Sequence, residues 1–491
     1  NATLKGSFKS RNFTKPDETL LQLNLNELTT NMRNIKLMFP ELKITEQFYR
    51  LGRISFSGNF DGFYSDFVAD GNLRTDLGRA KMSINFKTPT QIGRYSGNLN
   101  LYDFDLKTFS GNDDFGKVTF KSKVSGSGAT LPTLNIKIDS DIESFVYKEY
   151  PYENINIDGT FNKKSFIGEM GISDGNIDLV FNGEMNFNGD LPKFDLTSTI
   201  DHLDLKALNL SKDTYIFDAR LNLNFTGDDL DNIVGQARID DLNIETDNES
   251  FYVDSLVLNS SIDNEDFRKM NLKSEVLTAS LGGKYNIKGI EKPLLNFIAT
   301  NYPSYAKKLN ITYDAAYAEN NIEGTEKFAF KVNLLDSKNL PHLLDSKLDT
   351  IENLSVKANF NAVNNSFKFS LLLPNIKYDN IQVSGITANA NGVKDLGSVI
   401  INVRETTVGD LMIPSISLNN KLHKDTINFE TSVSSITDIF SALNINGEFY
   451  IIDKAEFYVN MAGNDITNGF HSFYQVQSFK QISSTFFNIF L

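Results

Sequence analysis

The stretch LNLNFTG at residues 221–227 alternates apolar and polar side chains and then ends in a glycine. An alternation with a period of two places the two leucines and the phenylalanine on one face of a β-strand and the asparagines on the other. The same alternation returns along the whole chain, for example as LQLNLN at residues 21–26 and as FKFSL at residues 367–371. It predicts an all-β protein whose strands are half-buried, with one apolar and one polar face.

Glycine stands next to Asn or Asp at recurring places, such as Gly58-Asn59, Asp158-Gly159 and Asn182-Gly183. Glycine and asparagine tolerate the positive φ angles of tight hairpins, so these pairs predict turns between strands. Three segments interrupt the alternation and predict short helices: 27–38, 340–354 and 436–443. None of them is long enough to organise an α/β fold, and we expect less than about 10% helix against the usual 30–35%.

The length of the chain limits the possible architectures. An open twisted sheet rarely exceeds about ten strands without curling, splitting or closing. A trough made by curling one long sheet would satisfy the pattern, and so would a solenoid or a row of sandwiches. Sandwiches predict a closed, dry core, whereas a trough predicts an apolar face that is reachable from one side. The uniform alternation, without any linker segment, favours a single elongated, mostly antiparallel sheet.

Composition excludes several classes of function. Among 491 residues there is no Cys, so disulfides, thiolate metal sites and cysteine nucleophiles are excluded together. The net charge of −14 disfavours binding to nucleic acid, which relies on Lys and Arg neutralising phosphates. The chain begins without a basic and apolar leader and contains no apolar run of 18 residues, so we expect an internal piece of a longer protein.

Catalytic motifs are poorly represented. The four His residues are scattered without the spacing of metal ligands. The segment 171–175, GISDG, formally matches the nucleophile-elbow pattern, but that motif requires a helix after the serine. Here the following residues alternate like another strand, so the segment predicts a hairpin turn. We expect no enzymatic activity, no metal and no cofactor.

Several of these strand-and-turn segments resemble a known family. The run YPYENINIDG at 150–159 and the run LGRISFSGNFDGF at 51–63 look like the repeat of the TamB branch of the AsmA-like superfamily. The segments 95–106 and 413–418 are similar in style. The resemblance covers roughly residues 1–460.

The resemblance implies a fold, a location and partners. Members are envelope proteins of diderm bacteria that are anchored in the inner membrane and cross the periplasm. Their β-structure is a taco-like trough with an apolar interior, and they are implicated in moving phospholipids to the outer membrane. The implied function is a non-enzymatic periplasmic conduit for phospholipid acyl chains between the two membranes. The alternative is a structural scaffold for outer-membrane protein assembly, with an Omp85-type barrel as partner. This chain shows no recognisable barrel-docking domain.

The alternation also yields candidate residues for the lining of the trough. They share an apolar side chain at an inward position: Ile54, Phe56, Phe60, Leu134, Ile136, Ile138, Ile155, Ile157, Ile177, Leu179, Phe181, Leu221, Leu223, Phe225, Phe367 and Phe369. We expect residues 1–461 to form one continuous repetitive β-groove region. Residues 462–491 lose the alternation, so they predict an irregular C-terminal tail.

Overall fold

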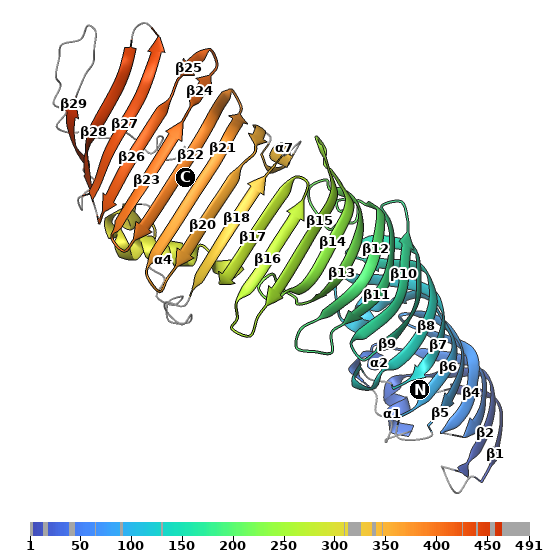
Figure 1. Ribbon diagram of the computed structural model, residues 1–491. Helices are drawn as coiled ribbons and strands as arrows, with labels where there is room; N and C mark the ends of the chain where they lie inside the picture. Colours follow the sequence, from blue (N-terminus) through green and yellow to red (C-terminus); the bar gives the residue numbers. More distant parts are fainter. Residues whose placement is uncertain are drawn as a thin grey trace. The chain divides into compact units, whose positions relative to one another are not determined.

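The computed structural model of the protein describes residues 3–12, 18–38, 45–63, 65–88, 92–128, 131–308, 310–312, 326–335, 340–345, 347–424, 426–437, 440–451 and 457–463. The chain divides into two compact units. Unit 1 comprises Asn1–Asp228 and Ala237–Tyr252, and unit 2 comprises Asp229–Gln236 and Val253–Leu491. Each unit is built on antiparallel strands joined mostly by short connections (Figure 1).

Unit 1 is an antiparallel sheet in which strands that follow one another in the chain are hydrogen-bonded neighbours. Its strands are β1 (Thr3–Arg11), β2 (Leu20–Thr30), β3 (Ile54–Phe63), β4 (Asp66–Thr75), β5 (Gly78–Lys87), β6 (Arg94–Asp105), β7 (Phe115–Ser127), β8 (Asn135–Tyr147), β9 (Tyr150–Asn162), β10 (Ser165–Ser173), β11 (Ile177–Asn186), β12 (Lys193–Leu203) and β13 (Ile216–Thr226). Two more strands, β14 (Val234–Glu245) and β15 (Ser250–Ile262), are divided between the units.

Unit 2 follows the same plan, with two small side branches. Its strands are β16 (Arg268–Ser274), β17 (Leu277–Lys284), β18 (Lys327–Leu334), β19 (Leu348–Glu352), β20 (Ser355–Asn361), β21 (Ser366–Tyr378), β22 (Ile381–Val393), β23 (Leu396–Val403), β24 (Glu405–Val408), β25 (Leu411–Ile413), β26 (Ile416–His423), β27 (Thr426–Thr437), β28 (Phe440–Ile451) and β29 (Phe457–Gly463). In the branches, β19 pairs with the end of β21, and the β24–β25 hairpin pairs with the start of β22.

Strands take up 67% of the described residues and α-helices 9%. The sheet is curled and does not close on itself. Figure 1 shows the strands of unit 1 bending along their length. The predicted fold class is therefore confirmed: a mostly antiparallel, curled β-sheet with a few short helices.

The helices are short and lie where strands end. They are α1 (Met32–Met38), α2 (Glu46–Tyr49), α3 (Leu106–Ser110), α4 (Lys292–Asn301), α5 (Pro303–Lys308) and α7 (Leu340–Leu344), with 3₁₀ turns η2 (Leu131–Thr133) and η3 (Ile287–Gly289).

The predicted helices agree with the structure only in part. The helix expected at 27–38 begins at Met32, because the preceding residues belong to β2. The helix expected at 340–354 ends at Leu344, and β19 follows it. The helix expected at 436–443 is wrong, since Ile436 and Thr437 end β27 and residues 440–443 begin β28, with Thr437 opposite Phe440. Pairing between strands overrides the local preference here.

Most of the glycines that predicted turns lie inside strands instead. Gly58 is in the middle of β3, Gly159 in β9 and Gly183 in β11. Gly183 has a φ of +147°, and a Cβ there would overlap the backbone oxygen of Asp195 on β12. Glycine is required by the close approach of the neighbouring strand and by a backbone angle that other residues rarely adopt.

The hairpin turns use other residues. Lys148 and Glu149 connect β8 to β9 with φ angles of +49° and +67°, as a two-residue type I′ turn requires. The GISDG segment forms a hairpin turn as expected: Asp174 N donates to the backbone oxygen of Ile177 (2.9 Å), and β11 begins there. The irregular tail predicted for 462–491 lies, after Gly463, outside the described residues.

A side-chain cap holds α3 in place. Asp105 accepts hydrogen bonds from Thr108 N (2.9 Å) and Thr108 Oγ1 (2.6 Å), and these bonds lower the pKa of the Asp105 carboxyl from its usual 3.8.

We expect Asp105→Ala to lower the free energy of unfolding by about 1 kcal/mol at pH 7. A lowered pKa stabilises the fold above pH 3.8, and the effect fades as the pH falls through the pKa of the folded state. Urea unfolding of both proteins should therefore converge at low pH, and a difference that persists there would contradict this.

Candidate functional site

The register of unit 1 gathers its apolar side chains on one face of the sheet, named here the apolar face. One row crosses β3 to β13 at right angles to the strands. It consists of Phe56, Leu73, Ala80, Leu101, Phe120, Ile142, Ile155, Ile172, Leu179, Ile200 and Ala219. Neighbouring strands lie about 4.8 Å apart, so the row runs for roughly 48 Å.

A second row follows the opposite margin of the same face and is rich in aromatic rings. It consists of Gly62, Phe67, Phe86, Tyr95, Gly126, Ile136, Phe161, Phe166, Met185, Phe194 and Phe225. Two further rows lie between these, one through Gly58 and one through Phe60. None of the four rows, all of whose residues are described, holds a charged side chain.

Thirteen of the predicted lining residues belong to this face. They are Ile54, Phe56, Phe60, Ile136, Ile138, Ile155, Ile157, Ile177, Leu179, Phe181, Leu221, Leu223 and Phe225. Leu134 lies just before β8 and is half-buried. Phe367 and Phe369 are on β21 of unit 2 and line the apolar face of that sheet.

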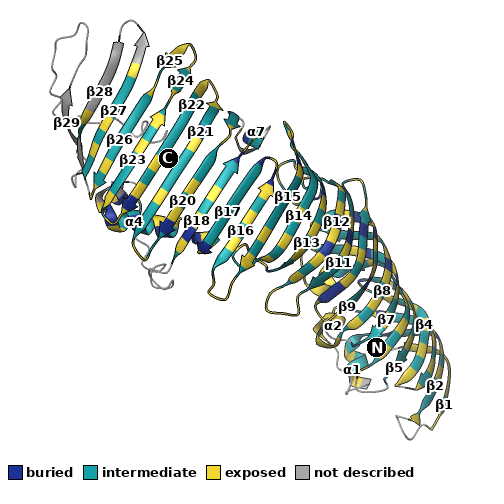
Figure 2. Cartoon of the chain, in the orientation of Figure 1, coloured by how far each residue is buried: buried dark blue, intermediate teal, exposed yellow. Residues whose placement is uncertain are grey.

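Most of the apolar face is only half-buried. Phe56, Phe60 and Leu223 are half-buried, while polar neighbours such as Asn59 and Asn222 on the other face are exposed. Figure 2 shows this alternation as stripes along the strands. In a sandwich the inner face would interdigitate with a second sheet and would be buried. The half-buried side chains indicate an apolar surface open to one side.

Several polar residues on the apolar face form hydrogen bonds with backbone oxygens of unit 1. Ser198 Oγ donates to the backbone oxygen of Val180 (2.9 Å), and Ser140 Oγ to that of Lys121 (3.3 Å). Tyr95, in the aromatic row, donates to the backbone oxygen of Gly128 (3.0 Å). Burial raises the pKa of the Tyr95 hydroxyl, so it stays neutral at physiological pH. These groups therefore offer little to a polar ligand.

The aromatic row packs ring on ring. Phe161 and Phe166 have centroids 4.7 Å apart, and Phe194 and Phe225 have centroids 5.0 Å apart. The ring of Phe166 also covers the open side of Gly159 on the adjacent strand. Most residues of this row were not predicted from the sequence. The alternation that contains Ile155 and Ile157 would have reached Phe161 if it had been continued past the glycine.

Helices and turns cover the apolar face locally. In unit 1, Met32 and Ile35 of α1 and Phe109 of α3 pack against a cluster that contains Ile54 and Leu77. A second cluster is closed by Leu208, which is fully buried against Ile155 and Ile177. The buried members of the predicted lining occur mainly where such cover exists, so cover and open surface alternate along the face.

Unit 2 has a comparable face with a larger cover. On β21, Phe367 lies opposite Phe360 and Gly392, and Phe369 lies opposite Ala358. From α4, Phe297 contacts Phe367 with ring centroids 5.2 Å apart and joins a cluster with Phe328 and Phe360. The helix therefore lies across the end of this apolar face.

The described residues show neither a cluster of metal ligands nor a membrane-spanning helix. They contain no group of three or more His, Asp or Glu side chains that could hold a metal ion. No helix within the described ranges is long and apolar enough to cross a membrane. Most ion pairs of the described residues lie at the surface, such as Arg79–Asp103 (3.1 Å), whose side chains are 59% and 66% exposed, and such pairs add little stability.

Comparison with known proteins gives no relative. No protein-family model matches the chain, and no curated protein and no solved structure is significantly similar to it.

Proposed function

We propose that the apolar face of unit 1 carries the hydrocarbon chains of lipids without chemical change. One observation supports this most directly: rows of uncharged residues cross β3 to β13, and most of their side chains remain half-exposed. Each CH₂ group removed from water contributes about 0.8 kcal/mol and makes no directional bond. A chain on such a face is held firmly, yet it meets low barriers between neighbouring positions.

The resemblance to TamB-like proteins supports a more specific form of the proposal. The cargo would be phospholipid, and the parent protein would be a conduit across the periplasm between the inner and outer membranes. The rival proposal is a scaffold for outer-membrane protein assembly with an Omp85-type barrel. A scaffold needs a dry core and an edge for its partner, and half-exposed phenylalanines supply no dry core.

Photo-crosslinking distinguishes the two proposals. We expect p-benzoylphenylalanine in place of Phe225, on the apolar face, to crosslink to a radiolabelled phospholipid added in vesicles. The same probe in place of Asn222, which is exposed on the opposite face of β13, should label at least tenfold less.

Equal labelling at the two positions would show non-specific contact with vesicles. If the protein is folded but the lipid labels neither the probe at Phe225 nor a probe at Phe60, near the other end of the rows, the result would favour the scaffold proposal.

A further inference from the structure

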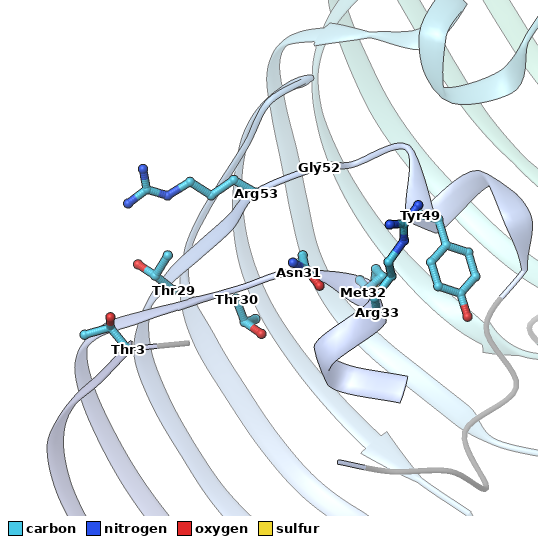
Figure 3. Close-up of a pocket in the computed structure, with 9 residues that line it drawn as sticks. All are labelled: Thr3, Thr29, Thr30, Asn31, Met32, Arg33, Tyr49, Gly52 and Arg53. Carbon is cyan, nitrogen blue, oxygen red and sulfur yellow. The ribbon is translucent and has the colours of Figure 1, made fainter. Parts of the chain in front are cut away.

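A cavity of about 560 Å³ lies at the start of β1, the end of β2 and the segment just before β3, beside α1 and α2. Figure 3 shows Arg53 on one side of it, Arg33 and Tyr49 on the other, and Thr30 between them. All of its lining residues belong to unit 1. In contrast to the apolar face, its lining is largely polar.

Thr30 is the unusual member of this lining. Its side chain is 5% exposed, and its Oγ1 is buried without a hydrogen-bond partner in the described structure. A buried hydroxyl without a partner costs about 1–3 kcal/mol, and such groups are rare in native proteins. An acceptor placed in the cavity would remove this cost.

The charges around the cavity favour an anion as that acceptor. Neither Arg33 nor Arg53 forms an ion pair within the described part of the chain. The nearby carboxylate of Glu27 is bound by Lys5 (2.9 Å), whose hydrogen bond is the main cause of its lowered pKa. Asp76 accepts a hydrogen bond from the backbone nitrogen of Arg53 (2.9 Å). Both nearby carboxylates are thus engaged. The charge of Arg53 also contributes to the lowered pKa of Glu27, whereas the guanidinium group of Arg33 has no ion-pair partner among the described residues.

The cavity adjoins the apolar face. Thr30 of β2 pairs with Ile54 of β3. Two residues before Thr30, Leu28 lies between Phe56 of β3 and Leu4 of β1 and pairs with both. Leu4 is 61% exposed, so the apolar face is open beside the cavity. An amphiphile could therefore place its chains on this face and its polar end in the cavity.

We propose that the cavity binds a phosphate-type anion through Arg33 and Thr30, either as the head group of a lipid on the apolar face or as free phosphate. Guanidinium groups match phosphate oxygens in geometry and charge, and the threonine hydroxyl donates to the same oxygens. The lipid form rests on the proposed function and deepens it, because it assigns a head-group class to the cargo.

The test compares two lipids with identical acyl chains, phosphatidylglycerol and diacylglycerol, which differ in the phosphate head group. We expect the full chain to retain phosphatidylglycerol about tenfold more tightly, as one charge-assisted contact allows. Arg33→Gln and Thr30→Val should each reduce this preference to about threefold or less while leaving diacylglycerol retention unchanged. Arg94→Gln, which removes the same charge at the opposite ends of the strands, should leave the preference intact.

Titration with inorganic phosphate separates this inference from the proposed function. If the chain retains neither lipid but binds phosphate, and Arg33→Gln weakens that binding about tenfold, the site is real and its ligand is free phosphate. If Arg33→Gln changes neither the lipid preference nor phosphate binding, the inference is overturned. Without ligand, Thr30→Val should melt no lower than the parent protein, since it removes an unpaired hydroxyl; a large fall would also count against the inference.

Discussion

Leu223→Asp is expected to weaken the retention of hydrocarbon chains by at least about tenfold while unit 1 remains folded. Leu223 lies opposite Leu196 in the row through Phe60, and its side chain is half-buried. In the empty trough the new carboxylate keeps contact with water, so we expect a loss of about 1–3 kcal/mol in the free energy of unfolding. A bound hydrocarbon chain would cover the charge, and moving an ion into hydrocarbon costs several kcal/mol. Because about 1.4 kcal/mol corresponds to a tenfold change in affinity, this cost accounts for the expected loss of binding.

The matched control is Asn222→Asp, which adds the same charge one residue earlier on the exposed face of β13. Both variants should keep the circular dichroism of an antiparallel sheet, and only Leu223→Asp should lose a fluorescent fatty-acyl probe. If Leu223→Asp unfolds unit 1, the apolar face is a sealed core. If it folds and binds as before, hydrocarbon does not lie on this face.

The face that carries this prediction could be found from sequence because its signal is local. The alternation LNLNF at 221–225 fixes which side chains share a face of β13 without any knowledge of its neighbours. Thirteen predicted residues fall on one face of unit 1 because each strand repeats that signal and each hairpin preserves the register. The burial of single residues was not predictable, since Leu208, which closes one cluster, lies in a turn outside any alternation.

Glycines were misinterpreted for the opposite reason. Gly58-Asn59 and Asn182-Gly183 have the composition of tight turns, and only the neighbouring strand shows why glycine is present. A Cβ on Gly58 would overlap the backbone oxygen of Asp70 on β4. The true turn at Lys148-Glu149 has no glycine at all. Turn composition is thus a weak guide in a sheet whose strands approach this closely.

The cavity at Thr30 could not be found from sequence either. It is lined by the start of β1, the end of β2, the start of α1 and the segment before β3, which are separated along the chain. The helix expected at 27–38 would have placed Thr30 inside a helix. In the structure it ends β2 on the apolar face, where its hydroxyl is buried.

The second large effect concerns the cover of unit 2. Phe297→Ala is expected to lower the free energy of unfolding of this unit by about 3–5 kcal/mol, as is usual for a fully buried aromatic ring. Phe297 is 3% exposed, contacts Phe367 with centroids 5.2 Å apart, and meets Phe360 edge-on at 6.5 Å. Its loss leaves a cavity between α4 and the sheet that the short helix cannot refill.

Leu294→Ala is the matched control, because Leu294 is on the same helix and 39% exposed. It should cost less than about 0.5 kcal/mol. Urea unfolding, followed by tyrosine fluorescence, to which Tyr285 and Tyr302 of the same cluster contribute, measures both variants. Equal costs would mean that α4 does not pack on the apolar face as described. A selective loss would show that Phe297 anchors α4 on the apolar face of unit 2.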